Sequence, residues 1–245
     1  MDISIELVPR NDESLKNDIK KIQAYLSNVS AINIPDLIRF KMRSWSACPV
    51  IKPYFSRVIP HLRAMDIDKS KPLPMVNTLK NSAVENVLII GGDRPHDFSR
   101  RIFPSSTIDI IRKFKQELPD IHIYAGMDPY RGNFREELEY MERKLEVGAC
   151  GFFTQPFFDI RLLEVFAELY RGVEVFWGVT PVLSKKSKGF WESKNNAIFP
   201  DEFKPTLDWN RKFAERALEC VSKYDSNIYF MPIRLDVAKY LQNII

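Results

Sequence analysis

The chain has 245 residues, a length that suits one large domain. Its hydrophobic content of 45%, beside 28% charged residues, is typical of a globular protein with a buried core. The formal net charge is only +4 and the Lys and Arg residues are scattered, so no basic face indicates nucleic-acid binding. An anionic small-molecule ligand fits this mild basicity better.

The three cysteines, Cys48, Cys150 and Cys220, stand alone in the sequence. Without CxxC or Cys/His spacing they indicate neither a disulfide framework nor a structural zinc site, and no HxH or HExxH pattern supports another metal. We find no basic segment followed by an apolar one at the start, and no run of ~18 apolar residues. The expectation is a cytoplasmic protein with reduced thiols and no membrane span.

Taken in chain order, short apolar runs alternate with amphipathic helical stretches. The runs are rich in Val, Ile, Phe and Tyr without clean polar alternation, which is typical of strands buried on both faces of a parallel sheet. The predicted strands are Ile3–Val8, Val29–Ile34, Val58–Leu62, Val87–Ile90, Ile121–Ala125, Cys150–Thr154, Val173–Val179 and Ile228–Ile233.

The helical stretches are marked by apolar stripes and by capping residues. Leu15, Ile19, Ile22 and Leu26 form one stripe at helical spacing. A second helix follows the N-cap candidates Ser105 and Ser106. A third begins after the N-cap candidate Asn133, and Gly148 is expected to end it. Further helices are predicted over residues 160–170, 207–221 and 235–243.

Eight strands, each followed by a helix or a shorter connection, predict right-handed parallel crossovers. The fold class is therefore α/β, and a single (β/α)8 (TIM) barrel over residues 1–245 is expected, because such barrels need ~250 residues. An open doubly wound sheet is the alternative, but no GxGxxG follows any strand to support a dinucleotide site. Residues 184–205 form the least regular connection, either a lid or pocket wall or a short extra helix over the barrel.

Side chains at the carboxyl ends of barrel strands face the active-site mouth. Glu6 stands between Ile5 and Leu7 inside a predicted strand. A carboxylate in an apolar barrel is costly unless it is paired or protonated, and burial raises its pKa, as a general acid near neutral pH requires. The alternative is a structural ion pair with one of three arginines, Arg10, Arg63 or Arg234.

Other polar groups follow the fourth, sixth and third strands. Asp93 comes after two glycines, which let the backbone approach a ligand, although a turn or N-cap Asp is the simpler interpretation. Gln155 lies in an aromatic run, and its amide can donate to and accept from a pterin or flavin edge; the aromatic rings could equally be core. His61 could contact a cofactor or satisfy a backbone group.

These residues, taken in order, resemble the methylenetetrahydrofolate reductase family. Ser4–Pro9 is similar to the family's first-strand Ser-Phe-Glu-Phe and proline, and Pro60-His61-Leu62 to its third-strand Pro-His-Leu. Gly92-Asp93 and Ala125-Gly126 match the ends of its fourth and fifth strands. The most specific match is Phe153–Asp159, and similarity is spread over the whole chain.

The resemblance implies a barrel that reduces the methylene bridge of 5,10-methylenetetrahydrofolate, or a related pterin, to a methyl group. Glu6 would be the general acid, Asp93 would stabilise the iminium cation, and Gln155, Asp93 and Phe157 would bind substrate. In the family the hydride comes from FAD reduced by NADH or NADPH. The residues implied in cofactor binding are His61, Gly92, Asp36, Arg43, Ala125 and Lys144.

The sequence departs from the family on the flavin side. Asn33-Ile34-Pro35-Asp36 stands where the family has Thr-Tyr-Gly-Ala, whereas Asp36 with Arg43-Ser44 resembles a divergent branch. Some members of the family transfer hydride directly from a nicotinamide. A second hypothesis is a non-catalytic or partner-dependent folate- or pterin-binding barrel subunit. The possible partners are a second copy of the chain, as a homo-oligomer, or a redox or methyl-transfer protein. A lyase or aldolase barrel is a third, and no strand-end lysine supports a Schiff base.

Overall fold

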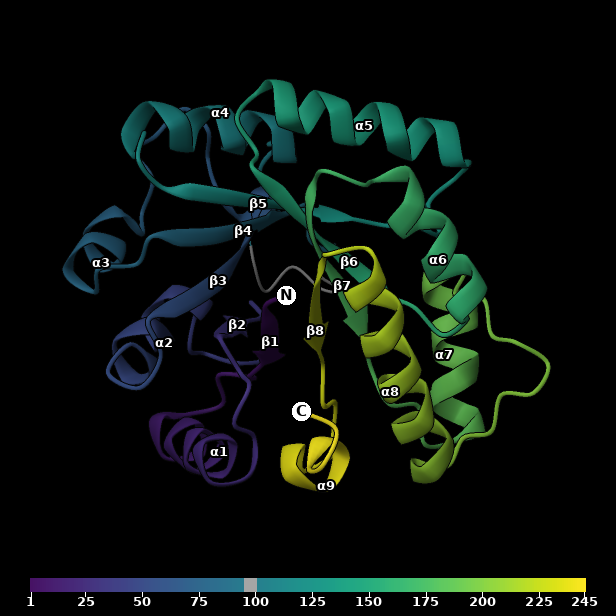
Figure 1. Ribbon diagram of the computed structural model, residues 1–245. Helices are drawn as coiled ribbons and strands as arrows, with labels where there is room; N and C mark the ends of the chain where they lie inside the picture. The colour runs from purple at the N-terminus through teal and green to yellow at the C-terminus, as the bar shows by residue number, and fades with distance from the viewer. Residues whose placement is uncertain (95–100) are drawn as a thin grey trace.

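The computed structural model describes residues 1–94 and 101–245 and confirms the predicted barrel. All neighbouring strands are parallel, and β1 pairs with both β2 and β8, which closes the sheet. Figure 1 shows the helices arranged around the outside of the strands. The strands are β1 (Ile3–Glu6), β2 (Ala31–Ile34), β3 (Arg57–Arg63), β4 (Asn86–Ile90), β5 (His122–Met127), β6 (Gly151–Pro156), β7 (Glu174–Val179) and β8 (Asn227–Phe230).

The helices lie in the connections between strands. The sequence predicts no helix after the second or third strand, but the structure has one after β2, which contains Pro49, and two short ones after β3. The helices are α1 (Asp12–Tyr25), α2 (Ser44–Ile51), η1 (Ala64–Asp66), α3 (Val76–Asn81), α4 (Thr107–Glu117), α5 (Phe134–Glu146), α6 (Ile160–Leu169), α7 (Lys185–Asn195), α8 (Leu207–Lys223) and α9 (Val237–Leu241).

The expected capping residues begin and end these helices. Ser106 caps α4 in a capping box with Asp109, in which each side chain bonds the other's backbone N–H. Asn133 caps α5 by accepting a hydrogen bond from the backbone N–H of Glu136 at 2.9 Å. Gly148 ends the same helix with a φ of +110°, a conformation that favours glycine. The caps therefore set each helix where the sequence places it.

The core has two layers, because alternate residues of each strand face the barrel lumen and the surrounding helices. Aromatic rings fill much of the lumen: Phe153 and Phe176 stack with centroids 4.4 Å apart, and Tyr229 packs beside Phe153. The other side chains of this apolar lumen cluster are Ala31, Ile59, Leu88, Tyr124, Met231 and the partly buried Ile90. Above this plug lies the carboxyl-terminal mouth.

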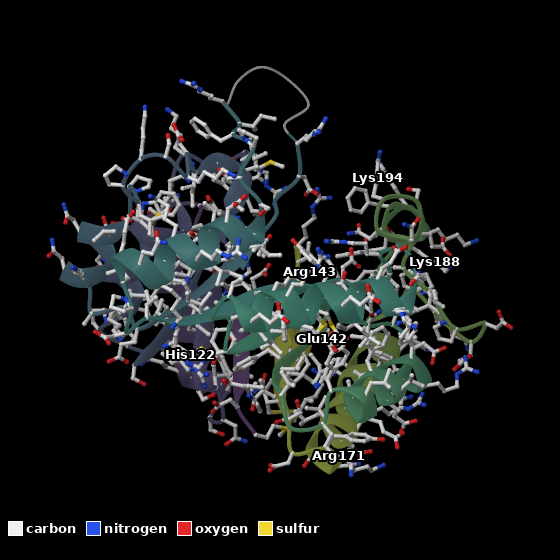
Figure 2. The ribbon with its side chains drawn as sticks, turned by 90° about the horizontal axis from the view of Figure 1, so that it is seen from above. His122, Glu142, Arg143, Arg171, Lys188 and Lys194 are labelled. Atoms are coloured by element: carbon white, nitrogen blue, oxygen red, sulfur yellow. The ribbon has the colours of Figure 1, made fainter. Side chains whose placement is uncertain are left out.

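Residues 184–205 contain the helix α7, one of the two structures expected for this segment; the other was a lid or pocket wall. Phe199 stacks on Phe158 at 4.2 Å and Trp191 lies 5.6 Å from the same ring, so the segment packs over the exit of β6. Lys188 and Lys194 of α7 lie at the periphery of the molecule (Figure 2). The lid function stays a prediction. Over the described residues no helix is long and apolar enough to cross a membrane.

Candidate active site

Three polar side chains meet in the lumen at the carboxyl ends of β1, β2 and β3. The register pairs Glu6 with Asn33, so their side chains project from neighbouring strands into the same lumen layer. Nδ2 of the fully buried Asn33 donates to Oε2 of Glu6 at 3.4 Å and lies 3.1 Å from Nε2 of His61. Ser4, one layer below, donates from Oγ to Oδ1 of Asn33 at 2.8 Å.

Burial sets the protonation states of this cluster. It raises the pKa of Glu6 to about 8 and lowers the pKa of His61 to about 3, because the charged form of each loses its hydration. At neutral pH Glu6 is therefore a protonated acid and His61 a neutral imidazole. The alternative ion pair with an arginine is not found in residues 1–94 and 101–245: Arg63 pairs with Asp66 at 3.3 Å instead. Glu6 thus has the electrostatics of a proton donor.

Asp93 follows β4 at the same end of the barrel, and its backbone is held by β3. Nη2 of the buried Arg63 donates to the backbone oxygen of Asp93 at 2.5 Å. The preceding Gly92 has a φ of +89°, and a Cβ there would lie 3.0 Å from Cζ of Arg63. Position 92 therefore requires glycine for two reasons, the positive φ and the close approach of the Arg63 side chain. The Asp93 carboxylate itself is exposed.

Gln155 is presented by an irregularity in β6. The register with β7 shifts between Phe153 and Pro156, so one extra residue is accommodated on β6. Oγ1 of Thr154 accepts the hydrogen bond of the Gly178 backbone N–H at 2.8 Å, and the Tyr229 hydroxyl donates to the Thr154 backbone oxygen. These bonds replace the lost ladder and leave Gln155 half-buried at the strand end.

Asp36 and Arg43, which the resemblance implied in cofactor binding, contact each other. Nη2 of Arg43 lies 2.5 Å from Oδ2 of Asp36 and 2.9 Å from Oδ2 of Asp66, and both carboxylates are buried. The guanidinium also stacks over the Trp45 ring at 4.4 Å. Arg63 joins the network through Asp66, so this cluster ties the loops after β2 and β3 together beside the mouth.

The other implied residues lie outside the mouth. Ala125 and Phe157 are fully buried in the layer between sheet and helices, where Phe157 packs against Phe166 and Trp177. The Phe157 side chain faces outward there, because this residue follows the β6 bulge, and its contact with substrate stays a prediction. The Ala125 side chain likewise lies on the outer face of β5, away from the lumen.

Lys144 is likewise enclosed, and its partners are protein groups. Its Nζ donates to the Gly126 backbone oxygen at 2.6 Å, lies 3.8 Å from Glu137 and sits over the Tyr140 ring. Burial lowers its pKa to about 8, although Glu137 opposes this. The residues implied for FAD are therefore divided between lumen, mouth network and outer layer. They do not fit a single flavin cradle in this structure.

Asn33 and Arg63 lie near strand ends in the sequence, but neither is predicted there as a binding residue. Both are interior positions, because Asn33 is two residues after the lumen residue Ala31, and Arg63 is two after His61. That period of two was the signal that could have grouped them with Glu6. Tyr229 had no such signal, since Thr154, whose backbone oxygen it contacts, is 75 residues away in the sequence. Within the described residues no cluster of His, Cys, Asp and Glu could hold a metal ion.

A closed parallel barrel with polar side chains gathered at the carboxyl ends of its strands is the architecture of a (β/α)8 barrel, a fold in which ligands bind at that end. The sequence matches the family model described as methylenetetrahydrofolate reductase over residues 10–219. The chain belongs to that family. Glu6 lies just before the matched stretch, so its role depends on the structure and on the first-strand resemblance.

Comparison with solved structures supports the fold alone, because the sequence identities are low. A 2,3-dimethylmalate lyase of the PEP mutase/isocitrate lyase superfamily aligns with a TM-score of 0.62 at 10% identity, over 95% of this chain and 74% of that one. An oxaloacetate acetylhydrolase gives 0.59 at 9% identity, over 94% and 74%. An aldolase, QR15, gives 0.57 at 9% identity, over 98% and 92%.

Proposed function

We propose that this protein reduces the methylene group of 5,10-methylenetetrahydrofolate, or of a related tetrahydropterin, to a methyl group. Family membership supports the reaction class. The observation that carries the proposal is the protonated Glu6 at the end of β1, whose pKa of about 8 suits proton donation near neutral pH.

In the proposed reaction the Glu6 carboxyl protonates the nitrogen that leaves the methylene carbon, which opens the imidazolidine ring to an iminium cation. A hydride then adds to that carbon and yields the methyl group. The exposed Asp93 carboxylate would stabilise the cation, and the half-buried Gln155 amide would hydrogen-bond the pterin. Both stand at strand ends on the same edge of the barrel as Glu6.

The proposed hydride donor is NADH or NADPH acting directly. The residues expected to hold FAD do not converge, because Lys144 is occupied by Gly126 and Glu137, and Asp36 is paired with Arg43. The visible spectrum of the purified protein tests this step. A colourless, flavin-free protein that oxidises the nicotinamide supports direct transfer, whereas stoichiometric bound flavin contradicts it.

The reaction is tested by pterin-dependent oxidation of the nicotinamide in the wild type and in Glu6→Gln. Removing a general acid lowers rates by roughly 10²- to 10⁴-fold, and the loss is expected in kcat with little change in KM. Glu142→Gln, at an exposed carboxylate of α5, is the matched control and keeps full activity. Full activity in Glu6→Gln would show that Glu6 is not the acid.

A second candidate is a folate-binding barrel that works only with a redox or methyl-transfer partner. The divided cofactor residues favour it, and so do the exposed apolar side chains Phe190 and Ile198 of the segment after β7, at 56% and 54% exposure. Folate binding by the isolated chain, without turnover with either nicotinamide or flavin, would support this candidate over the first.

A further inference from the structure

Asn33 is the centre of the lumen cluster, and each polar atom of its amide has a partner. Oδ1 accepts from the Ser4 hydroxyl at 2.8 Å, whereas Nδ2 faces Glu6 Oε2 at 3.4 Å and His61 Nε2 at 3.1 Å. The nitrogen of a side-chain amide carries two hydrogens, both of which it can donate, and it accepts no hydrogen bond. Each of these hydrogens therefore has one acceptor, a carboxyl oxygen on β1 and an imidazole nitrogen on β3.

We propose that Asn33 is a positioning residue that fixes which oxygen of Glu6 carries the transferable hydrogen and which nitrogen of His61 is protonated. Nε2 of His61 accepts from Nδ2, so the single hydrogen of the neutral ring is on Nδ1. Oε2 of Glu6 accepts as well, and a carbonyl oxygen accepts better than a hydroxyl oxygen. The acidic hydrogen is therefore on Oε1.

The Ser4 hydroxyl holds the amide in this orientation by donating to Oδ1. A hydroxyl can also accept, so an amide rotated by 180° keeps a bond to Ser4, but its oxygen then faces Glu6 Oε2 and His61 Nε2, and both of those atoms must carry the hydrogen. The orientation of the amide therefore sets both hydrogens together. Asn33 is fully buried, so water does not compete for these bonds. An aspartate here would lack both hydrogens, and a leucine of similar size would lack all three contacts.

The proton-transfer part of this inference rests on the proposed function, whereas the His61 part does not. The groups that face Glu6 from the packed strands are Asn33 on β2 and Tyr229 on β8, and His61 on β3 contacts the Asn33 amide. Burial keeps His61 neutral, and it holds the pKa of Tyr229 well above its usual value, with the charge of Glu6 adding to that shift. A titration of this cluster near neutral pH therefore belongs to Glu6.

The first test is nuclear magnetic resonance of the protein labelled with ¹⁵N-histidine, which reports the tautomer of each ring without any need for activity. The chain has 3 histidines, and His61→Gln assigns the His61 signals. We expect a neutral ring protonated on Nδ1 at every pH at which the protein is folded. In Asn33→Leu we expect the Nε2-protonated form to appear. A wild-type ring protonated on Nε2, or an unchanged tautomer in Asn33→Leu, would overturn the proposal.

The second test is an infrared titration of the Glu6 carboxyl, taken as the difference between wild type and Glu6→Gln. Loss of the Nδ2 donor removes a hydrogen bond to the ionised form, so Asn33→Leu should raise the Glu6 pKa by roughly one unit. Ser4→Ala loosens the amide without touching Glu6, and its shift should have the same direction and a smaller size. Ser4→Ala also carries the test if Asn33→Leu does not fold. A fall in the pKa, or no change in either variant, would contradict the proposal.

The matched control is Asn227→Leu, which removes a lumen amide at the opposite end of the barrel, where Asn227 accepts from the Asp2 backbone N–H at 2.7 Å. It should leave both the His61 tautomer and the Glu6 titration unchanged. If the wild type reduces no pterin, the proposed reaction fails. The two spectroscopic outcomes still decide whether Asn33 positions the pair.

Discussion

The partly buried carboxyl of Glu6 is expected to lower the stability of the protein near neutral pH. Its pKa is about 8 in the folded state and 4.5 in the unfolded chain. The folded state therefore binds the proton more tightly, and this contribution is complete below pH 4.5 and is lost as the pH rises through about 8. Near neutral pH the residue weakens the fold relative to a neutral isostere.

Glu6→Gln should accordingly be roughly 10²- to 10⁴-fold slower than the wild type but more stable at alkaline pH. The expected gain in the free energy of unfolding is about 1–3 kcal/mol at pH 8, falling to nothing at pH 4. Urea denaturation at both pH values measures it. The wild-type rate should decline as the pH rises through about 8, because the acid becomes ionised. A variant that is equally destabilised at both pH values would show that Glu6 is not a buried neutral acid.

Gly92 offers a second prediction for a single residue, since it combines a left-handed backbone with contact to Arg63. Gly92 and Gly172 have φ values of +89° and +90°, but nothing lies within 4 Å of a Cβ at Gly172. Alanine at either position should cost about 1–2 kcal/mol through backbone strain. Only Gly92→Ala should also displace Arg63, release the Asp93 backbone and lower kcat/KM. Equal activity in the two variants would contradict a functional role for this contact.

At the scale of the element, the bulge in β6 depends on the Thr154 hydroxyl. Thr154→Val keeps the shape but removes the acceptor of the Gly178 N–H, which leaves a buried donor unpaired at a cost of about 1–3 kcal/mol. Because Gln155 is the next residue, we also expect a higher KM for the pterin. Thr154→Ser keeps the hydroxyl and should keep the stability and KM close to those of the wild type. A Thr154→Val variant with the stability and KM of the wild type would show that the hydroxyl does not support the bulge.

Secondary-structure elements were predictable because their signals are local. The stripe from Leu15 to Leu26 and the caps Ser106 and Asn133 define helices from adjacent residues alone, and all are found in the structure. Strand ends were less accurate: β1 ends at Glu6 and β8 at Phe230, two or three residues earlier than expected. Pairing decides those ends, and pairing partners are distant in the sequence.

A site residue was predictable only where the sequence of its own strand was enough to identify it. Glu6 and His61 were recognised because each interrupts an apolar run, and both lie in the lumen cluster. The outward position of Phe157 could not be foreseen, because it depends on a bulge that Tyr229 supports from β8, two strands away and distant in the sequence. The Arg43 bridge between Asp36 and Asp66 could not be foreseen either, because it joins loops that are separate in the sequence.

At the scale of the whole molecule, the two ends of the lumen carry different polar clusters. The carboxyl end holds Glu6, Asn33 and His61. At the amino end Glu174 accepts from Tyr124 at 2.7 Å and from Arg57 at 2.8 Å, and Arg57 also pairs with Asp2. In barrels of this kind the amino-terminal face contributes stability and the carboxyl-terminal face contributes chemistry.

Glu174 should therefore matter for folding and not for turnover. Burial raises its pKa, but hydrogen bonds from His122, Tyr124 and Arg57 outweigh that effect and lower it from 4.5 to about 2. The stabilisation by its charge is therefore complete above pH 4.5 and is lost as the pH falls toward 2. The Glu174 side chain is 30% exposed, so solvent screening reduces the contribution to about 1–2 kcal/mol.

Glu174→Gln should lower the free energy of unfolding by that amount at pH 7, and the difference from wild type should shrink steadily below pH 4.5. Its kcat and KM at pH 7 should match those of the wild type. Glu168→Gln, at an exposed site on α6, controls for loss of a negative charge and should change neither property. A large fall in kcat for Glu174→Gln at a temperature at which it is fully folded would mean that the two ends of the barrel are coupled through the aromatic plug between them.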